Sequence, residues 1–344
     1  ATGIIGNNLA RHLVAGGWEV CGISRRRPSD IEQVRPITVD LTDGTAVAAE
    51  LAGIDPTHVF FTTWSRQPTE AENCRVNGGM VRNVLEAVEA SQGLTHVALV
   101  TGLKHYMGPF DAYGAGKPET PFREESPRLE FENFYYTQED EMFKVVERRG
   151  FTWSVHRPHT IIGWAIGNAM NMGVTLAVYA TICRETGRPF EFPGTPEQWN
   201  FISDVTDARL LAKHLEWAAI TPEAANTPFN VVNGDVFRWR RMWGVLAAAL
   251  GVEPAPYPGA AVPLEERMRD AGPIWDRIVE KHGLEKFAVE TLASWWHSDL
   301  DLGRDMESFT DMTNSRVRGF REFQQTEGSF LDLFDRLRTE RIIP

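Results

Sequence analysis

The sequence predicts an α/β fold built on a parallel sheet, and three observations support this prediction. Strand-like apolar segments alternate with segments of helical apolar spacing through the first 158 residues. Such alternation is typical of βαβ units, in which right-handed crossovers make successive strands parallel. The chain also opens on a glycine turn, residues 1–6, that leads directly into a helical pattern. Beyond Pro158 the alternation stops, so a second, mainly helical lobe is expected.

Apolar periodicity, glycine stops and turn residues define the individual elements in chain order. The helices of the first part are predicted at residues 4–17, 77–91 and 134–150. Its strands are predicted at residues 18–24, 37–41, 57–64, 95–102 and 151–158, with one more at 227–234. A long helix rich in methionine and small residues is predicted at 167–187, and the chain from 235 onward is mainly helical. Together these elements predict a Rossmann-type, doubly wound parallel sheet with a smaller, mainly helical lobe.

The two predicted domains are each assembled from separated pieces of the chain. The Rossmann domain is predicted to comprise residues 1–160 and about 200–234, and the second lobe about 161–199 and 235–344. A dinucleotide-binding turn normally follows a strand. We therefore expect a hydrophobic strand ending in glycine to precede Ala1.

The composition indicates a globular protein and disfavours several classes of partner. The 344 residues are 42% hydrophobic, which is enough apolar material for a sizeable core. The net charge of −12 and the isoelectric point near 5.3 disfavour nucleic acids and anionic membranes, which require basic surfaces. No apolar run approaches the roughly 20 residues needed to span a bilayer. Three scattered cysteines and nine histidines without ligand spacing predict a cytoplasmic, metal-free protein.

The glycine turn at the start of the chain has a cofactor interpretation. Gly3 and Gly6 stand in the T-G-x-x-G spacing of a short-chain dehydrogenase turn, where the first helix would meet a pyrophosphate. The predicted contacts are Thr2, Gly3, Ile4, Ile5 and Gly6. The alternative is a tight turn that only begins a helix.

The end of the second strand indicates which dinucleotide would bind. Ser24 is followed by Arg25, Arg26 and Arg27, where many NAD enzymes carry an acidic residue for the ribose hydroxyls. Arginine at this point suits a 2′-phosphate, so NADPH is predicted. The alternative is a solvated basic turn. Asp40 and Leu41 are predicted to flank the adenine, and Thr63 and Trp64 to border the cofactor.

Short-chain dehydrogenases usually carry a catalytic Y-x-x-x-K pair on a helix, and the literal match here is rejected. Tyr113 and Lys117 have two glycines between them, and Pro118 disfavours helical geometry at Lys117. Tyr135, which begins an amphipathic helix, is the better candidate. Its neighbour Tyr136 is expected to face less inward. Four residues after Tyr135 comes Glu139, so the usual lysine is absent.

Lys104, just after a predicted strand, is a candidate for the missing cation. Its ammonium could reach Tyr135 from another element. A nearby positive charge would favour the phenolate of Tyr135 and improve it as an acid–base or oxyanion-stabilising group. For Lys104 the alternative is a solvated loop lysine, and His105 and Tyr106 beside it are expected to be structural.

Six stretches of the chain together resemble one protein family. They are TGLKHYMGPF (101–110), NFYYTQED (133–140), TWSVHRPHTIIG (152–163), QPTEAENCRVN (67–77), FNVVNGDVFRWRRMW (229–243) and WWHSDL (295–300). The chain resembles the progesterone 5β-reductase/iridoid synthase-like family of atypical extended short-chain dehydrogenases. The resemblance implies an NADPH-dependent reductase acting on the activated C=C bond of a small-molecule enone or enal. It also implies that Lys104 and Tyr135 are catalytic and stabilise an enolate after hydride reaches the β-carbon.

The remaining predicted site residues complete this hypothesis. Further cofactor contacts are predicted at Thr101, Gly102, Tyr135, Pro158 and Ile161. The predicted substrate pocket comprises Trp64, Phe110, His159, Trp164, Met170 and Met172. His159 stands where the plant enzymes of the family have a small residue. The resemblance therefore does not define the shape of the pocket or the substrate.

Two other functions remain as alternatives at this point. One is an NADP-dependent carbonyl reductase or a sugar-nucleotide epimerase on the same scaffold, which would be expected to keep the Y-x-x-x-K pair. The other is a catalytically silent NADPH-binding regulator, which would need neither Lys104 nor Tyr135. A homodimer is a further expectation.

Overall fold

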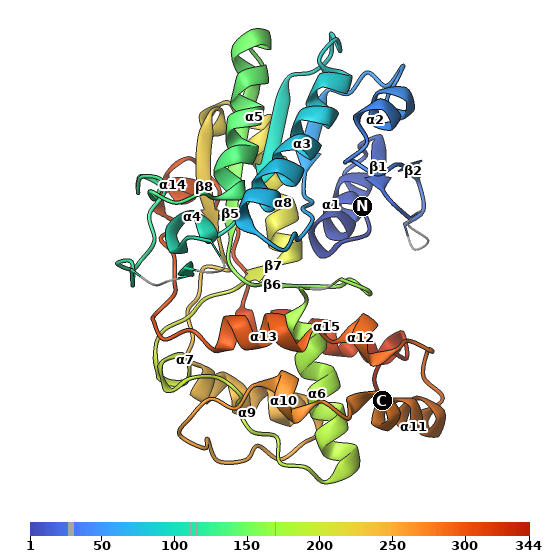
Figure 1. The fold of residues 1–344 in the computed structure, drawn as a ribbon, viewed down its shortest axis with the longest axis vertical. Coiled ribbons are helices and arrows are strands. Elements are labelled where there is room, and N and C mark those ends of the chain that lie inside the picture. Colours follow the sequence, from blue (N-terminus) through green and yellow to red (C-terminus); the bar gives the residue numbers. More distant parts are fainter. Residues whose placement is uncertain (27–30, 110–111, 114–115, 169) are drawn as a thin grey trace. The chain divides into compact units, whose positions relative to one another are not determined.

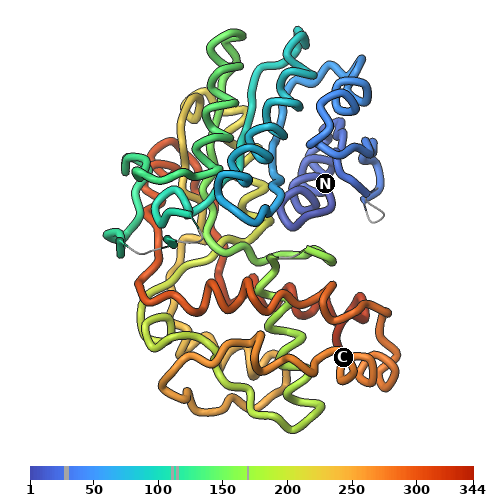
Figure 2. Tube along the Cα trace, in the orientation of Figure 1, coloured from blue at the N-terminus to red at the C-terminus, as the bar shows by residue number. Residues whose placement is uncertain are grey.

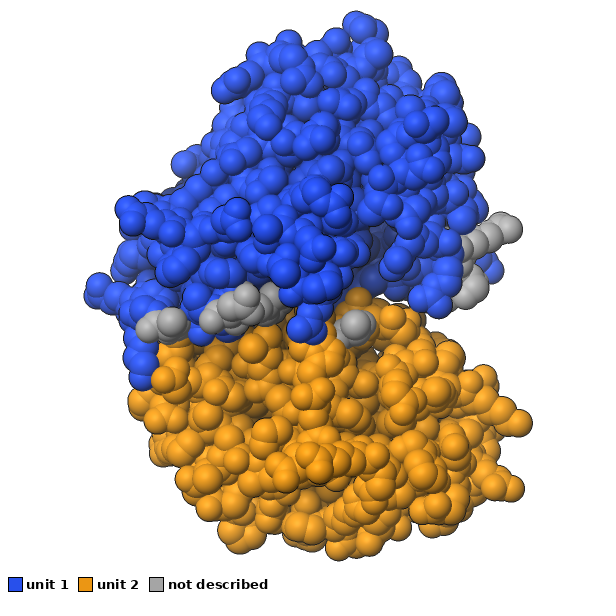
Figure 3. All heavy atoms as spheres, viewed as in Figure 1, with its two compact units in different colours: residues 1–159, 211–231, 310–322 blue, residues 160–210, 232–309, 323–344 orange. Residues whose placement is uncertain are grey.

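The computed structural model describes residues 1–26, 31–109, 112–113, 116–168 and 170–344. Two compact units share these residues, and Figure 3 colours them separately. The first unit comprises Ala1–His159, Leu211–Val231 and Thr310–Glu322. The second comprises Thr160–Leu210, Val232–Phe309 and Phe323–Pro344. The segment Thr310–Glu322 thus falls in the first unit, whereas the sequence analysis assigned it to the helical lobe.

The first unit contains the parallel sheet, and the predicted α/β fold is confirmed. Its strands are β1 (Val20–Ser24), β2 (Val34–Thr38), β3 (His58–Phe61), β4 (His96–Val100), β5 (Thr152–Pro158) and β8 (Thr227–Val231). β1 pairs with β2, and the other four form a sheet in the order β3-β4-β5-β8, with every pair parallel. The amino group of Ala1 donates to the carbonyl of Ile23 at 2.7 Å, so the first residue lies beside β1.

Helices cover both faces of the four-stranded sheet. The helices of this unit include α1 (Ile4–Ala15), α2 (Gly44–Glu50), α3 (Glu70–Val88), α4 (Lys104–Met107), α5 (Phe134–Arg149), α14 (Thr313–Val317) and most of α8 (Ala208–Ile220). α3 and α5 lie side by side on one face (Figure 1). Their close approach requires Gly78, because a Cβ there would lie 2.6 Å from the Cγ2 of Thr137 on α5.

The strands alternate strictly between these two faces, as a pleated backbone requires. Val97 and Leu99 of β4 and Val155 of β5 belong to the hydrophobic core formed with α3 and α5. The intervening residues of β5 face the other side, where His156 contacts His214 of α8. Packing on both faces explains why both strands are buried over most of their length.

A chain of buried polar groups crosses that second face. The Nε2 of His96 and the Nε2 of His156 both contact the hydroxyl of Ser154, each at 2.9 Å. The Nδ1 of His156 lies 3.1 Å from the Nδ1 of His214, whose Nε2 contacts the hydroxyl of Ser315 at 2.9 Å. All three histidines are fully buried. Each ring is therefore satisfied by neutral hydrogen-bonding partners.

Three predicted boundaries differ from the structure. β2 begins at Val34 and includes Pro36, which pairs with Gly22. Because β2 is an edge strand, a residue without an N–H is tolerated there. α3 begins seven residues earlier than predicted because the side chain of Thr69 accepts from the N–H of Glu72 and caps the helix.

The third difference concerns the methionine-rich helix, which is shorter than predicted. α6 comprises Met172–Thr186 and begins where the side chain of Asn171 accepts from the N–H of Val174. Gly187 ends the helix in the left-handed conformation at φ 70°. The residues before Asn171 are not helical where the structure describes them.

The second unit is mainly helical, as predicted. Its elements are β6 (Ile161–Ile162), β7 (Thr206–Asp207), α6, α7 (Pro196–Asn200), α9 (Trp239–Leu250), α10 (Leu264–Arg267), α11 (Ala271–His282), α12 (Val289–Leu292), α13 (Trp295–Leu302) and α15 (Thr326–Thr339). α6 contacts α9, α11, α12, α13 and α15, and its path among them can be followed in Figure 2. Its residues from Met172 to Cys183 are buried. In the described part of the chain, no helix has the length and apolarity that crossing a membrane requires.

Candidate active site

The candidate site lies where β4 and β5 end. Thr101 and Gly102 follow β4 directly, and the N–H of Thr101 donates to the carbonyl of His156 at 2.8 Å. The hydroxyl of Tyr135 lies over Gly102, 3.1 Å from the place that a Cβ on that residue would take. The carbonyl of Pro158 lies 3.3 Å from the same point. The phenol of Tyr135 is therefore at the carboxyl edge of the sheet, where open α/β sheets bind ligands.

Gly102 gives the first expected result at this site. In Gly102→Ala, the new methyl group must displace the hydroxyl of Tyr135 or the carbonyl of Pro158 by a few tenths of an ångström. We expect about tenfold lower kcat, because small displacements of a reacting group are costly. The melting temperature should change little. The control is Gly79→Ala, since nothing lies within 4 Å of a Cβ at that position. Equal kcat in the two variants would contradict the expectation.

The first turn of α5 holds Tyr135 in place through its cap. Asn133 is the N-cap, and its Oδ1 accepts from the N–H of Tyr135 at 3.0 Å. Its Nδ2 donates to the carbonyl of Lys104 at 2.8 Å. Asn133 thus joins the backbone of α4 to the start of α5. Sequence analysis omitted Asn133 from the site, although asparagine just before a helical pattern is a capping signal.

Lys104, the other predicted catalytic residue, is buried rather than solvated. It begins α4 and is 4% exposed. Its Nζ contacts the carboxylate of Glu70, at 3.1 Å from Oε2 and 3.3 Å from Oε1. The same ammonium lies 4.4 Å from the ring centroid of Phe134. The solvated-loop alternative for Lys104 is therefore wrong.

The pKa of Tyr135 is raised, whereas the sequence predicts that it is lowered. Burial raises the pKa of Tyr135, and Tyr113 and Glu70 raise it further. The sequence analysis predicted that Lys104 would favour the phenolate. The removal of the phenol from water outweighs such an effect. Tyr135 is therefore a neutral hydrogen-bond donor near physiological pH.

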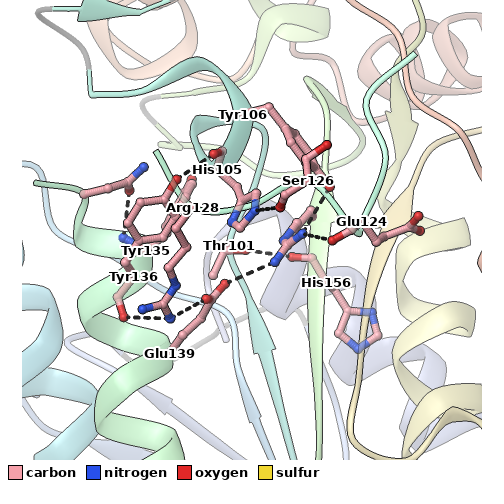
Figure 4. Close-up of polar contacts among 12 residues, drawn as sticks. Thr101, His105, Tyr106, Glu124, Ser126, Arg128, Tyr135, Tyr136, Glu139 and His156 are labelled. Atoms are coloured by element: carbon pink, nitrogen blue, oxygen red, sulfur yellow. Dashed lines mark hydrogen bonds and ion pairs between the residues drawn. The ribbon is translucent and has the colours of Figure 1, made fainter. Parts of the chain in front are cut away.

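Tyr136 is buried as a whole residue, whereas Tyr135 has a buried hydroxyl on a partly exposed side chain. This corrects the expectation that Tyr136 faces less inward. Its hydroxyl donates to the carbonyl of His105 at 2.6 Å and accepts from the N–H of Leu129 at 3.0 Å (Figure 4). The guanidinium of Arg128 lies over its ring. Both hydrogen-bonding directions of this hydroxyl are thus occupied by the backbone, and Tyr136 fixes the loop before α5.

Glu139 stands where the usual lysine of a Y-x-x-x-K pair would be, and it has a structural partner. Its Oε2 accepts from Arg128 at 2.7 Å, and Arg157 lies 3.8 Å from Oε1 (Figure 4). The rejected match, Tyr113 and Lys117, is not a helical pair. Lys117 has φ 43°, in the left-handed region, and the described residues around it are not α-helical.

His105 and Tyr106 have structural partners, as predicted. Burial lowers the pKa of His105 to about 3, with Arg157 as a further cause, and the Nε2 contacts the carbonyl of Ser126 at 3.2 Å. The hydroxyl of Tyr106 donates to Asn230 at 2.7 Å and accepts from Arg157 at 3.2 Å. Burial raises the pKa of Tyr106 to about 12. Neither group changes charge near neutral pH.

The start of α1 suits a pyrophosphate. Gly3 is the N-cap, no side chain caps the helix, and its first turn contains no acidic residue. The N–H groups of Ile4, Ile5 and Gly6 therefore belong to an uncapped helix terminus that can hold an anion. Thr2 precedes this turn and is exposed.

The residues predicted to bind the nucleoside lie at the ends of β1, β2 and β3. Arg25 and Arg26 are exposed beyond Ser24, whose hydroxyl donates to the carbonyl of Arg26 at 2.6 Å. Hydrogen bonds from Thr42, with Arg25 as a minor cause, lower the pKa of Asp40. Arg27 lies outside the described residues.

Two further predicted cofactor residues follow β3, and a third follows β2. Trp64 stacks on Phe134 with ring centroids 5.1 Å apart, next to the Lys104–Glu70 pair. Thr63 precedes it in the same loop, and Leu41 packs against the core of α3 and α5.

The predicted pocket residues divide between the two units. His159 is buried at the end of the first stretch of unit one. The pocket residues Trp164, Met170 and Met172 belong to the second unit, as does Ile161, a predicted cofactor contact. Met172 is 1% exposed and lies in the hydrophobic core of that unit. Phe110 lies outside the described residues. Among the described residues, no group of three His, Cys, Asp or Glu side chains could hold a metal ion.

Several solved structures share the fold of this protein. The UDP-glucose 4-epimerase of Thermus thermophilus, in complex with NAD, is similar with a TM-score of 0.66 and 17% identity, covering 98% of this chain and 96% of that one. The UDP-glucose 4-epimerase of Thermotoga maritima, with UDP-glucose, gives a TM-score of 0.68 at 13% identity, with coverage of 98% and 96%. At these identities the likeness concerns the fold alone, a Rossmann-type sheet with a second lobe.

The family follows from sequence comparison. The PRISE-like Rossmann-fold domain matches residues 40–344, and the chain belongs to this family. It is 42% identical to the (S)-8-oxocitronellyl enol synthase of Nepeta racemosa, over 100% of this chain and 91% of that protein. It is 38% identical to the 3-oxo-Δ4,5-steroid 5β-reductase of Arabidopsis thaliana, with the same coverage. The resemblance stated from the sequence motifs is confirmed.

Proposed function

We propose that this protein is an NADPH-dependent ene-reductase that performs 1,4-reduction of the activated C=C bond of enones or enals. A 3-oxo-Δ4,5-steroid is an enone, and 5β-reduction saturates its C=C bond, so the relatives named above support this reaction class. The observation that carries the proposal is the hydroxyl of Tyr135, which lies directly over Gly102 and whose pKa is raised by its removal from water. A neutral donor at that point suits a carbonyl oxygen that gains negative charge.

Different residues of the chain would bind the cofactor and activate the substrate. The uncapped start of α1 would hold the pyrophosphate, and Arg25 and Arg26 the 2′-phosphate. NADPH, when bound, supplies the hydride for the β-carbon of the substrate. Tyr135 donates a hydrogen bond to the carbonyl oxygen and stabilises the resulting enolate. Lys104 adds positive potential beside it, and solvent supplies the proton for the α-carbon.

The preference for NADPH over NADH is tested at the two arginines. In Arg25→Ala/Arg26→Ala, we expect the KM for NADPH to rise by about tenfold or more, because a charged partner of the 2′-phosphate is lost. The KM for NADH should stay nearly constant. Arg35→Ala removes an exposed charge on β2 and serves as the control. Equal effects on both cofactors would assign the arginines to a solvated turn.

The reaction itself is tested by NADPH oxidation and product analysis. The panel comprises cyclohexenone, an acyclic enal such as 8-oxogeranial, and progesterone. We expect products in which the C=C bond is saturated and the carbonyl is retained. Products that are allylic alcohols would instead identify a carbonyl reductase. NADPH binding without turnover on any substrate would favour the silent regulator.

Location and assembly complete the proposal. We propose that the protein is cytoplasmic, because the proposed reaction consumes NADPH and the cytoplasm supplies it. The three cysteines form no disulfide in the structure, which suits a reducing compartment. Fractionation of cells that express the protein tests the location. Light scattering tests the proposed homodimer.

A further inference from the structure

Glu70 joins three elements of the first unit at the candidate site. It begins α3, and its side chain is 11% exposed. Its Oε1 accepts from the backbone N–H of Phe134 at 2.9 Å, and its Oε2 accepts from the Nδ2 of Asn73 at 3.1 Å. Both oxygens also contact the Nζ of Lys104. The carboxylate thus holds α3, α4 and α5 together.

These contacts bear directly on the two proposed catalytic residues. Phe134 immediately precedes Tyr135, and its N–H belongs to the first turn of α5, where a negative charge is favourable. Asn73, the partner of Glu70 on α3, also accepts from the N–H of Gln67 at 2.8 Å and so fixes the loop after β3. The ammonium of Lys104 lies between the carboxylate of Glu70 and the ring of Phe134.

We propose that Glu70 is a positioning residue of the active site, which keeps the buried Lys104 ammonium charged and fixes it against the turn that carries Tyr135. A buried ammonium without a counter-charge loses its proton readily. Removal of Glu70 therefore changes the charge state of Lys104 as well as its position. The kinetic consequence of this role rests on the proposed ene-reductase function.

Other titratable groups lie near the Lys104–Glu70 pair, on α3 and on α5. Cys74 lies on α3, where burial raises the pKa of its thiol, Glu70 and Glu132 raise it further, and Lys104 lowers it. Tyr135 lies on α5. A test of Glu70 must therefore separate Lys104 from both of these groups.

The first test uses stability, which requires no activity. Glu70→Gln keeps an acceptor for Phe134 but removes the charge. We expect its melting temperature to fall by roughly 5 °C at about pH 7. The loss of melting temperature should shrink as the pH rises towards about 10. Over this range the unfolded chain holds a proton at Lys104 that the folded variant lacks, so the free energy of unfolding of the variant rises with pH.

Two companion variants make this result specific. Lys104→Met leaves the carboxylate of Glu70 without its cation. The loss of melting temperature in this variant, relative to the parent protein, should therefore shrink as the pH falls. In Glu70→Gln/Lys104→Met both charges are gone, and the pH-dependent part of the deficit should vanish. Glu72→Gln is the matched control, since Glu72 lies in the same helical turn and contacts Thr69.

The second test is kinetic. With the best enone substrate, Glu70→Gln should lose about tenfold in kcat at about pH 7 and more at higher pH. The KM for NADPH should change less. A merely structural role would lower kcat equally at every pH. An alkaline loss of activity that persists in Glu70→Gln/Lys104→Met would belong to Cys74 or Tyr135 and would overturn the proposal.

The two tests distinguish this proposal from the proposed function. A pH-dependent deficit in Glu70→Gln that disappears with Lys104 supports the role of Glu70, even if the parent protein reduces no enone. A deficit that is independent of pH, or unchanged by Lys104→Met, overturns that role and leaves Glu70 as a helix-terminal hydrogen bond. Turnover by the parent protein decides the enzyme function separately.

Discussion

Tyr135→Phe should lose on the order of a hundredfold in kcat, the usual loss when one donor to a developing oxyanion is removed. The ring and its packing on Phe134 remain, so only the hydroxyl over Gly102 is deleted. NADPH affinity should change little if the phenol acts mainly on the substrate oxygen. Stopped-flow or steady-state NADPH oxidation measures the first quantity, and quenching of protein fluorescence by NADPH measures the second.

Two other tyrosines serve as controls for this result. Tyr136→Phe removes a hydroxyl that is bonded to the backbone at His105 and Leu129, so it should lower the melting temperature more than it lowers kcat. Tyr113→Phe should retain most activity. Turnover that survives in Tyr135→Phe but is lost in Tyr113→Phe would mean that the catalytic tyrosine has been assigned incorrectly.

A neutral Tyr135 suits the proposed reaction. A dehydrogenase that oxidises an alcohol needs a base, which a phenolate supplies. Reduction of a conjugated C=C bond needs a donor to the carbonyl oxygen, and a phenolate cannot donate. Burial, Tyr113 and Glu70 all raise the pKa of Tyr135 and so preserve the donor. The ion pair of Lys104 with Glu70 is consistent with a neutral phenol, because the carboxylate of Glu70 offsets the tendency of the lysine charge to favour the phenolate.

Much of this site follows from local sequence patterns. The alternation of strands and helices predicts the parallel sheet, and the ends of β4 and β5 then bring Gly102 and Pro158 together. The selection of Tyr135 over Tyr113 depends on Pro118 and on helical spacing, and the structure places Tyr135 over the sheet edge. Such features depend on residues close in sequence or on the rules of parallel sheets.

The partners of Lys104 could not be predicted in the same way. Glu70 lies 34 positions from Lys104, on a helix whose start was predicted seven residues too late. That predicted boundary leaves Glu70 outside the helix. The pKa of Tyr135 was likewise predicted in the wrong direction, because burial of one side chain depends on the packing of the whole unit. Long-range charge pairs and desolvation thus require the three-dimensional structure.

The second large expected effect concerns acid stability. Burial lowers the pKa of His96 to about 4 and that of His214 to about 3. Burial also lowers the pKa of His156 well below its usual value, with His214 and His96 as further causes. At pH above about 6.5 these histidines are neutral in the folded and unfolded chains, so they cost nothing. Below that pH the unfolded chain binds protons that the folded chain excludes, and stability falls.

Glu124 acts in the opposite direction over part of the same range. Burial raises its pKa to about 7, so the folded chain holds a proton there that the unfolded chain releases above about 4.5. His105, whose pKa burial lowers to about 3, is a fourth histidine of this kind. Four histidines less one carboxyl group give a net uptake on unfolding of about three protons between roughly pH 4.5 and 6.5. At about 1.4 kcal/mol per proton and pH unit, we expect the free energy of unfolding to fall by roughly 4 kcal/mol per pH unit.

Single histidine substitutions test this account. His214→Gln keeps hydrogen-bonding capacity toward Ser315 and removes one titrating ring, so the slope should decrease by about one proton equivalent. Urea unfolding at several pH values measures the slope. Because His156 lies between the other two rings, His156→Gln should also change how His96 and His214 titrate. A slope that is the same in all these variants would show that other groups cause the loss of stability in acid.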